Sequence, residues 1–182
     1  MRVHLILTAR IVACCAAALA LVGCGAGQIA QTDSDVAAVN GSSGNAGDAR
    51  NGIALRDVLI PHPPNQRGDY PAGSTVPVVL TIVNQAGSAD ELIGVSSPAA
   101  SQALVVGTML IPPGSTVTST AVPLAAEPTS PLVAGQLYIA LITTQPLHAG
   151  LNTPVTFQFR NAGKVTLSVP MAAPPASAVQ AP

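Results

Sequence analysis

Apolar and polar residues alternate in short runs over most of this chain. From about residue 53 onward, runs rich in Val, Ile, Leu and Thr are separated by clusters of Gly, Pro, Asn and Ser. Polar and apolar positions alternate within Thr156–Phe159 and Lys164–Val169, which is typical of half-buried strands. Arg160–Gly163, between them, contains the Asn and Gly of a tight hairpin. The pattern predicts strands at Ile53–Ile60, Thr75–Val83, Glu91–Ser96, Ala103–Leu110, Thr116–Val122, Gln136–Thr143, Pro154–Phe159 and Lys164–Val169.

Breaker residues argue against long helices. The chain has 17 prolines and 16 glycines, and most of them fall between the predicted strands. Pro77 lies inside one run, which indicates an edge strand or the start of a strand. Short strands with turn signals between them favour an all-β fold, and we predict an antiparallel β-sandwich over residues 52–171.

The N-terminal segment has the features of an export signal. Arg2 and Arg10 precede the uncharged run Ile11–Val22. This run is shorter than the roughly 20 apolar residues of a membrane-spanning helix. Leu21-Val22-Gly23-Cys24 resembles a bacterial lipobox. That resemblance implies a signal peptide at residues 1–23, a lipid on Cys24, and anchoring to the extracytoplasmic face of the cell membrane. The alternative is an ordinary secretory cleavage site beside an unrelated cysteine.

Two polar flanks bound the predicted domain. Residues 24–51 are rich in Gly, Ser, Ala and Asn, a composition that cannot bury enough apolar surface to fold by itself. We therefore expect a flexible tether there. The Ala- and Pro-rich residues 172–182 are expected to be a disordered tail.

Composition excludes several functions. Aromatic residues are 2% and charged residues 8%, so neither a base-stacking surface nor a basic nucleic-acid footprint is expected. Once Cys14 and Cys15 leave with the signal, Cys24 is the only cysteine, which leaves no intrachain disulfide, thiolate metal site or cysteine nucleophile.

Catalytic motifs are not found either. The sequence has no Gly-x-Ser-x-Gly elbow and no glycine-rich phosphate loop before a helix. Asp90 and Glu91 are adjacent carboxylates, but neighbours on a strand point to opposite faces. We predict that the protein is not an enzyme.

Several segments, in order, resemble the periplasmic copper chaperones called PCu(A)C. Residues 83–100 are similar to that family's "N-x-G-x-x-D-x-L-x-x-x-S-S-P-x-A" segment, and residues 111–117 to its "I-P-A-G-x-T-V". Residues 146–150 resemble "P-L-x-x-G", and residues 161–166 the "x-A-G-x-V-T" hairpin. The resemblance implies a cupredoxin-like β-sandwich that holds Cu(I) with two His and two Met.

The ligand positions of that family are not matched. Its His-x-Met, on the strand before "P-L-x-x-G", corresponds to Tyr138 and Ala140. Its other ligand pair lies between "S-S-P-x-A" and "I-P-A-G", where Ser101–Leu110 has no His and only Met109. A phenol and a methyl group do not replace imidazole and thioether for Cu(I). We therefore expect no metal cofactor, and a binding or interaction module with a protein partner in the cell envelope.

Two alternative functions stay open. A divergent copper chaperone could use His62 and His148 if they converge, although each is simplest to interpret as an exposed loop residue. Met109 and Met171 are expected in the core or at a strand end. The apolar composition also fits a carrier of lipid or small apolar ligands. Tyr138 is either buried or lines an opening.

Overall fold

The computed structural model describes residues 41–65, 68–123 and 133–172. The chain divides into two compact units. The first unit, Met1–Ala38, includes the predicted signal peptide and Cys24, and it lies outside the described residues. Val39–Pro182 contains all of the strands described below. The described residues contain no helix long and apolar enough to cross a membrane.

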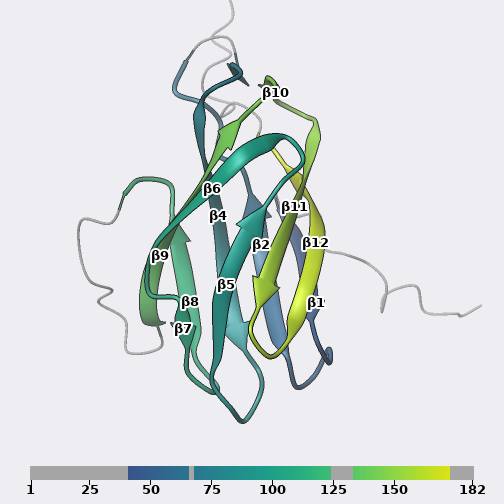
Figure 1. Cartoon of the computed structure of the whole chain (residues 1–182), viewed down its shortest axis with the longest axis vertical. Coiled ribbons are helices and arrows are strands. Elements are labelled where there is room, and N and C mark those ends of the chain that lie inside the picture. The colour runs from purple at the N-terminus through teal and green to yellow at the C-terminus, as the bar shows by residue number, and fades with distance from the viewer. Residues whose placement is uncertain (1–40, 66–67, 124–132, 173–182) are drawn as a thin grey trace, which may run out of the picture. The chain divides into compact units, whose positions relative to one another are not determined.

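Two sheets face one another across an apolar core (Figure 1). The four-stranded sheet has the order β12 (Gly163–Pro170), β11 (Asn152–Phe159), β5 (Asp90–Ser96) and β7 (Leu110–Ile111). A two-stranded pair joins β10 (Leu147–His148) to β3 (Asp69–Tyr70). The six-stranded sheet has the order β1 (Ser42–Ala46), β2 (Ile53–Leu59), β4 (Thr75–Asn84), β8 (Thr116–Thr120), β9 (Val133–Thr143) and β6 (Ala100–Gly107).

The predicted strands and the predicted class are confirmed. Each of the eight apolar runs contains or overlaps at least one strand, and alternate residues of β4 and β11 are buried between the sheets. The Arg160–Gly163 turn joins β11 to β12, with Gly163 at φ +83°, where a side chain would be strained. The pairing departs from a purely antiparallel sandwich at β8 and β9, which run parallel.

Strand β4 changes its neighbour halfway along its length. Its first residues pair with β9, from Thr75 opposite Ile142 to Val78 opposite Ile139, and its later residues pair with β8. Pro77 lies in the first part, near the strand start as expected, where a missing N–H is tolerated. At the change of partner, the Ser119 hydroxyl donates to the Val78 carbonyl (2.9 Å) and accepts from the Leu80 N–H (2.7 Å). This one side chain pairs two backbone groups that the branching leaves without a strand partner.

The flexible tether expected over residues 24–51 does not extend that far. Ser42–Ala46 forms β1, which pairs with β2 and contacts β12 at one side of the sandwich. A Cβ added to Gly44 would fall on the Leu167 side chain, so β1 approaches β12 more closely than a larger residue would allow. The polar composition of Ser42–Ala46 gives no strand signal, because this strand is held by backbone pairing rather than by apolar side chains. At the other end, the Ala172 N–H donates to the Ile60 carbonyl (2.8 Å), and residues 173–182 lie outside the described range.

Candidate functional site

Tyr138 and Ala140 lie on the outer face of the six-stranded sheet. Their neighbours in β9, Leu137, Ile139 and Leu141, are fully buried in the core between the sheets. Successive strand residues point to opposite faces, so Tyr138 and Ala140 project away from that core. Tyr138 is 8% exposed and Ala140 is 0% exposed. The tyrosine is thus largely buried rather than open to solvent, but outside the main core cluster.

Strand β6 places Ser101–Gly107, most of the segment assigned to the second ligand pair, directly beside these positions. In the antiparallel register of β6 with β9, Val106 is opposite Tyr138 and Leu104 is opposite Ala140. Residues opposite one another in a ladder share a face of the sheet, with Cβ atoms about 5 Å apart. Leu104, Val106, Tyr138 and Ala140 therefore form one cluster, which we call the β6–β9 quartet. Its only heteroatom is the tyrosine hydroxyl oxygen.

The methionines do not join this cluster as ligands. Met109 was expected in the core, and this was wrong: its side chain is 40% exposed in the crossing from β6 to β7. It leaves the core because the adjacent backbone turns to the other sheet, where its carbonyl accepts the Leu92 N–H (3.0 Å). Met171 is 3% exposed and forms an isolated bridge with Ile60 just after β12.

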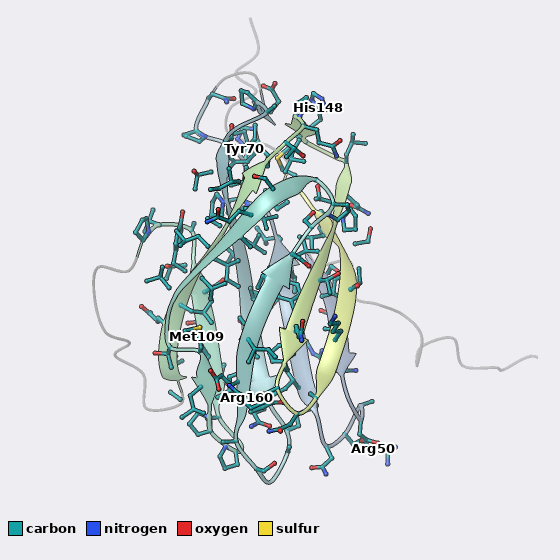
Figure 2. All side chains as sticks on the ribbon, in the orientation of Figure 1. Arg50, Tyr70, Met109, His148 and Arg160 are labelled. Atoms are coloured by element: carbon teal, nitrogen blue, oxygen red, sulfur yellow. The ribbon has the colours of Figure 1, made fainter. Side chains whose placement is uncertain are left out.

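The two histidines lie at the same end of the domain. His148 is an exposed residue of β10 and is paired with Asp69 of β3. Figure 2 shows His148 at the same end of the domain as Tyr70. His62 is half-buried in the loop after β2, and its Nε2 lies 3.6 Å from the position of a Cβ added to Gly68, next to Asp69. One carboxylate oxygen of Asp69, Oδ1, is buried without a hydrogen-bond partner. Within the described residues, no three His, Cys, Asp or Glu side chains are grouped so as to hold a metal ion.

Tyr70 lies at this end of the domain, and its pKa is influenced by Tyr138 of the β6–β9 quartet. Its hydroxyl donates to the Pro61 carbonyl (3.0 Å), next to His62. Burial raises the pKa of Tyr70 above its ordinary value, and repulsion from the ionised form of Tyr138 raises it further. The Tyr70 phenol is therefore neutral at physiological pH and offers a hydrogen bond rather than a charge.

A cavity of about 380 Å³ lies beside the β11–β12 hairpin, and the buried Asp90 carboxylate that lines it is engaged by backbone groups. The Asp90 carboxylate accepts the N–H groups of Glu91 (2.7 Å), Asn161 (2.9 Å) and Ala162 (2.8 Å). The adjacent Glu91 forms an ion pair with Arg160 (2.8 Å) at the surface. Asp90 and Glu91 thus make separate structural contacts.

A second cavity, of about 310 Å³, lies at the histidine end. Its lining is mostly apolar or uncharged and includes Leu147, His148, Leu151 and Pro154. His148 contributes the only imidazole among the residues that line it.

Comparison with known proteins identifies relatives of this chain. A family model described as "Putative lipoprotein LpqE-like" matches residues 53–171. The chain is 34% identical over 156 residues to "Putative lipoprotein LpqE" of Mycobacterium leprae, covering 84% of this chain and 81% of that protein. It is 35% identical over 159 residues to the protein of the same name from Mycobacterium tuberculosis strain H37Rv, covering 86% and 84%.

Solved structures share the fold at lower sequence identity. The apo PCuAC domain from PmoF1 superposes with a TM-score of 0.53 at 19% identity, over 72% of this chain and 99% of that domain. The copper-bound PCuAC domain from PmoF2 gives 0.52 at 20% identity, over 72% and 98%. These matches confirm the cupredoxin-like sandwich expected from the sequence.

Proposed function

This chain belongs to the LpqE-like lipoprotein family, and we propose that it is a non-enzymatic binding or interaction module held in the cell envelope by a lipid on Cys24. It has the sandwich of a copper chaperone, while the strands that would carry the metal ligands hold the β6–β9 quartet instead. In this proposal the domain engages a partner in the envelope rather than transferring copper.

The register between β6 and β9 is the observation that supports this proposal. The two segments assigned to the ligand pairs are adjacent strands, and Val106 opposite Tyr138 and Leu104 opposite Ala140 place four side chains together. Cu(I) favours thioether, thiolate and imidazole ligands. The side chains of the quartet, an isobutyl, an isopropyl, a methyl and a phenol, offer none of these groups.

A Cu(I) titration against a chromophoric competitor tests the proposal. We expect the unaltered chain to leave the competitor complex intact at submicromolar free Cu(I). A variant with Val106→His, Leu104→Met, Tyr138→His and Ala140→Met restores two imidazoles and two thioethers on one face, and we expect it to bind one Cu(I) per chain. Stoichiometric submicromolar binding by the unaltered chain would refute the proposal. Failure of the four-residue variant to gain copper would show that the quartet does not occupy a metal position.

A second candidate function is copper binding at the histidine end. It is favoured by one observation: His62 and His148 both lie near Asp69, whose Oδ1 has no hydrogen-bond partner. If this site carries copper, replacing both histidines with alanine removes the binding. Binding that is unchanged in the His62→Ala, His148→Ala variant eliminates this candidate.

A further inference from the structure

Strand β6 forms an edge of the six-stranded sheet. Among the described residues it pairs with β9 alone, on one side. Figure 1 shows it crossing from the end of β5 to run along β9. An edge strand presents a row of backbone N–H and C=O groups that can pair with another strand.

The direction of these backbone groups follows from one hydrogen bond. Just beyond the strand, the Thr108 N–H donates to the Gln136 carbonyl (2.8 Å), so Thr108 and Gln136 are a hydrogen-bonded pair of the ladder. Such pairs alternate with pairs whose backbone groups point the other way. Val106 and Leu104 therefore bond to β9, while the N–H and C=O groups of Val105 and Ala103 point to the free edge.

This edge has little of the usual protection against pairing. Natural edge strands carry charged side chains, proline or bulges that prevent association. Gln102–Gly107 contains no charge and no proline, and the irregularity in its pairing lies earlier, between Ala100 and Gln102. Leu104 is 42% exposed and Val106 is 47% exposed on the outer face beside that edge.

We propose that the free edge of β6 pairs antiparallel with β6 of a second copy of this chain. The pairing is self-complementary: with the two-fold axis at Leu104, Ala103 of each copy forms a hydrogen-bonded pair with the partner's Val105. Leu104 then meets the partner's Leu104 in the close, non-hydrogen-bonded type of pair, about 4.5 Å between Cα atoms. Every contact occurs twice, as in an isologous dimer.

The self-complementary register points to a second copy as the occupant, and the charge distribution does not oppose it. Residues 92–159 include a single charged residue, Glu127, so two copies can approach along β6 without like-charge repulsion. A two-fold axis through an antiparallel pair is perpendicular to the sheet, so both outer faces, with their β6–β9 quartets, turn to the same side. Anchoring through Cys24 would confine both copies to one membrane surface, which raises their effective concentration.

The inference gives the proposed interaction function a partner, and the two can fail separately. The Cu(I) titration tests the absence of metal binding, whereas oligomeric state tests the β6 pairing. A dimer that binds copper would refute the proposed function alone. A monomer that does not bind copper would refute the β6 pairing alone.

The experiment uses the full lipidated chain in mild detergent and compares matched variants. Leu104→Lys places two ammonium groups opposite one another at the axis. Leu151→Lys introduces the same group at a more exposed leucine (61%) near the histidine end. By sedimentation velocity we expect the unaltered chain and Leu151→Lys to dimerise alike, and Leu104→Lys to raise the dissociation constant at least about tenfold. Far-UV circular dichroism checks that both variants keep the sheet. A purely monomeric unaltered chain, or equal dimerisation of the two variants, would overturn the proposal.

Cross-linking tests the register independently. In the lipidated chain the Cys24 sulfur is alkylated, so Leu104→Cys supplies the free thiol. A short bismaleimide should yield covalent dimers from Leu104→Cys at least about tenfold faster than from Leu151→Cys, since only the former thiols meet at the axis. Equal rates would show that any dimer uses another surface.

Discussion

Replacing Asp90 with alanine should destabilise the sandwich far more than the same change at Glu91. The Asp90 carboxylate is 5% exposed and accepts three backbone N–H groups, two of them from the turn between β11 and β12. It therefore ties the start of β5 to a hairpin about seventy residues away in sequence. Glu91 makes an ion pair with Arg160 at side chains that are 35% and 61% exposed.

The magnitudes follow from these contacts. A net contribution of about 1 kcal/mol per hydrogen bond gives about 3 kcal/mol for Asp90→Ala, because the cavity beside Asn161 and Ala162 gives solvent access to the freed donors. An exposed ion pair contributes about 0.2–1 kcal/mol, so Glu91→Ala should cost less than about 1 kcal/mol. Both variants remove one negative charge from neighbouring positions of one strand, which makes them a matched pair.

Urea unfolding followed by far-UV circular dichroism measures both costs. Amide hydrogen exchange gives a local check: the N–H groups of Asn161 and Ala162 should lose protection in Asp90→Ala and keep it in Glu91→Ala. The reasoning is refuted if the two variants differ by less than about 1 kcal/mol in the free energy of unfolding, or if those two amides exchange alike in both.

Two further predictions concern the other polar contacts of the fold. Ser119→Ala leaves the Leu80 N–H and the Val78 carbonyl buried and unpaired where β4 changes partner, and it should cost about 2 kcal/mol of unfolding free energy. The exposed Ser101→Ala, which removes one surface hydrogen bond, should cost less than about 0.5 kcal/mol in the same urea assay; equal costs would contradict this account. The pKa of Tyr70 is raised in the folded state, so its contribution to stability is complete below the ordinary value of 10.0 and is lost as pH rises above it, because the unfolded chain releases that proton first. Thermal unfolding between neutral pH and pH 11 should show a smaller decline for Tyr70→Phe, and parallel curves for the two proteins would contradict the assignment.

The sequence was sufficient to predict strands whose signal is in their side chains. Alternation along Thr75–Val83 and Lys164–Val169 records which residues face the core, and these runs are β4 and β12 in the structure. Strand β1 gave no such signal, since Ser42–Ala46 is held by backbone pairing and by the absence of a side chain at Gly44. The two-residue strands β3 and β10 are too short for any periodicity.

The sequence could assign the candidate site to two segments, but it could not show which of their side chains lie together. Tyr138 and Ala140 were identified by their place before the "P-L-x-x-G" turn, and Ser101–Leu110 by its place between two motifs. That Val106 is opposite Tyr138 depends on the register between β6 and β9, which is a long-range pairing with no local signal. The position of His62 near Asp69 likewise depends on how the loop after β2 returns to β3.

The residues that carry the family resemblance are those that hold the fold together. Asn84 is fully buried, and its amide donates to the carbonyls of Ser88 (2.8 Å) and Ile111 (2.9 Å). Asp90 fixes the β11–β12 hairpin, and the Ser97 hydroxyl donates to the Pro154 carbonyl (2.7 Å), joining the β5–β6 corner to β11. These side chains make contacts with backbone groups, so a resemblance built on them predicts the sandwich and carries no information about copper. The fold can therefore persist when the outer face of β6 and β9 changes, because the contacts that specify it lie in the turns and corners rather than in the β6–β9 quartet.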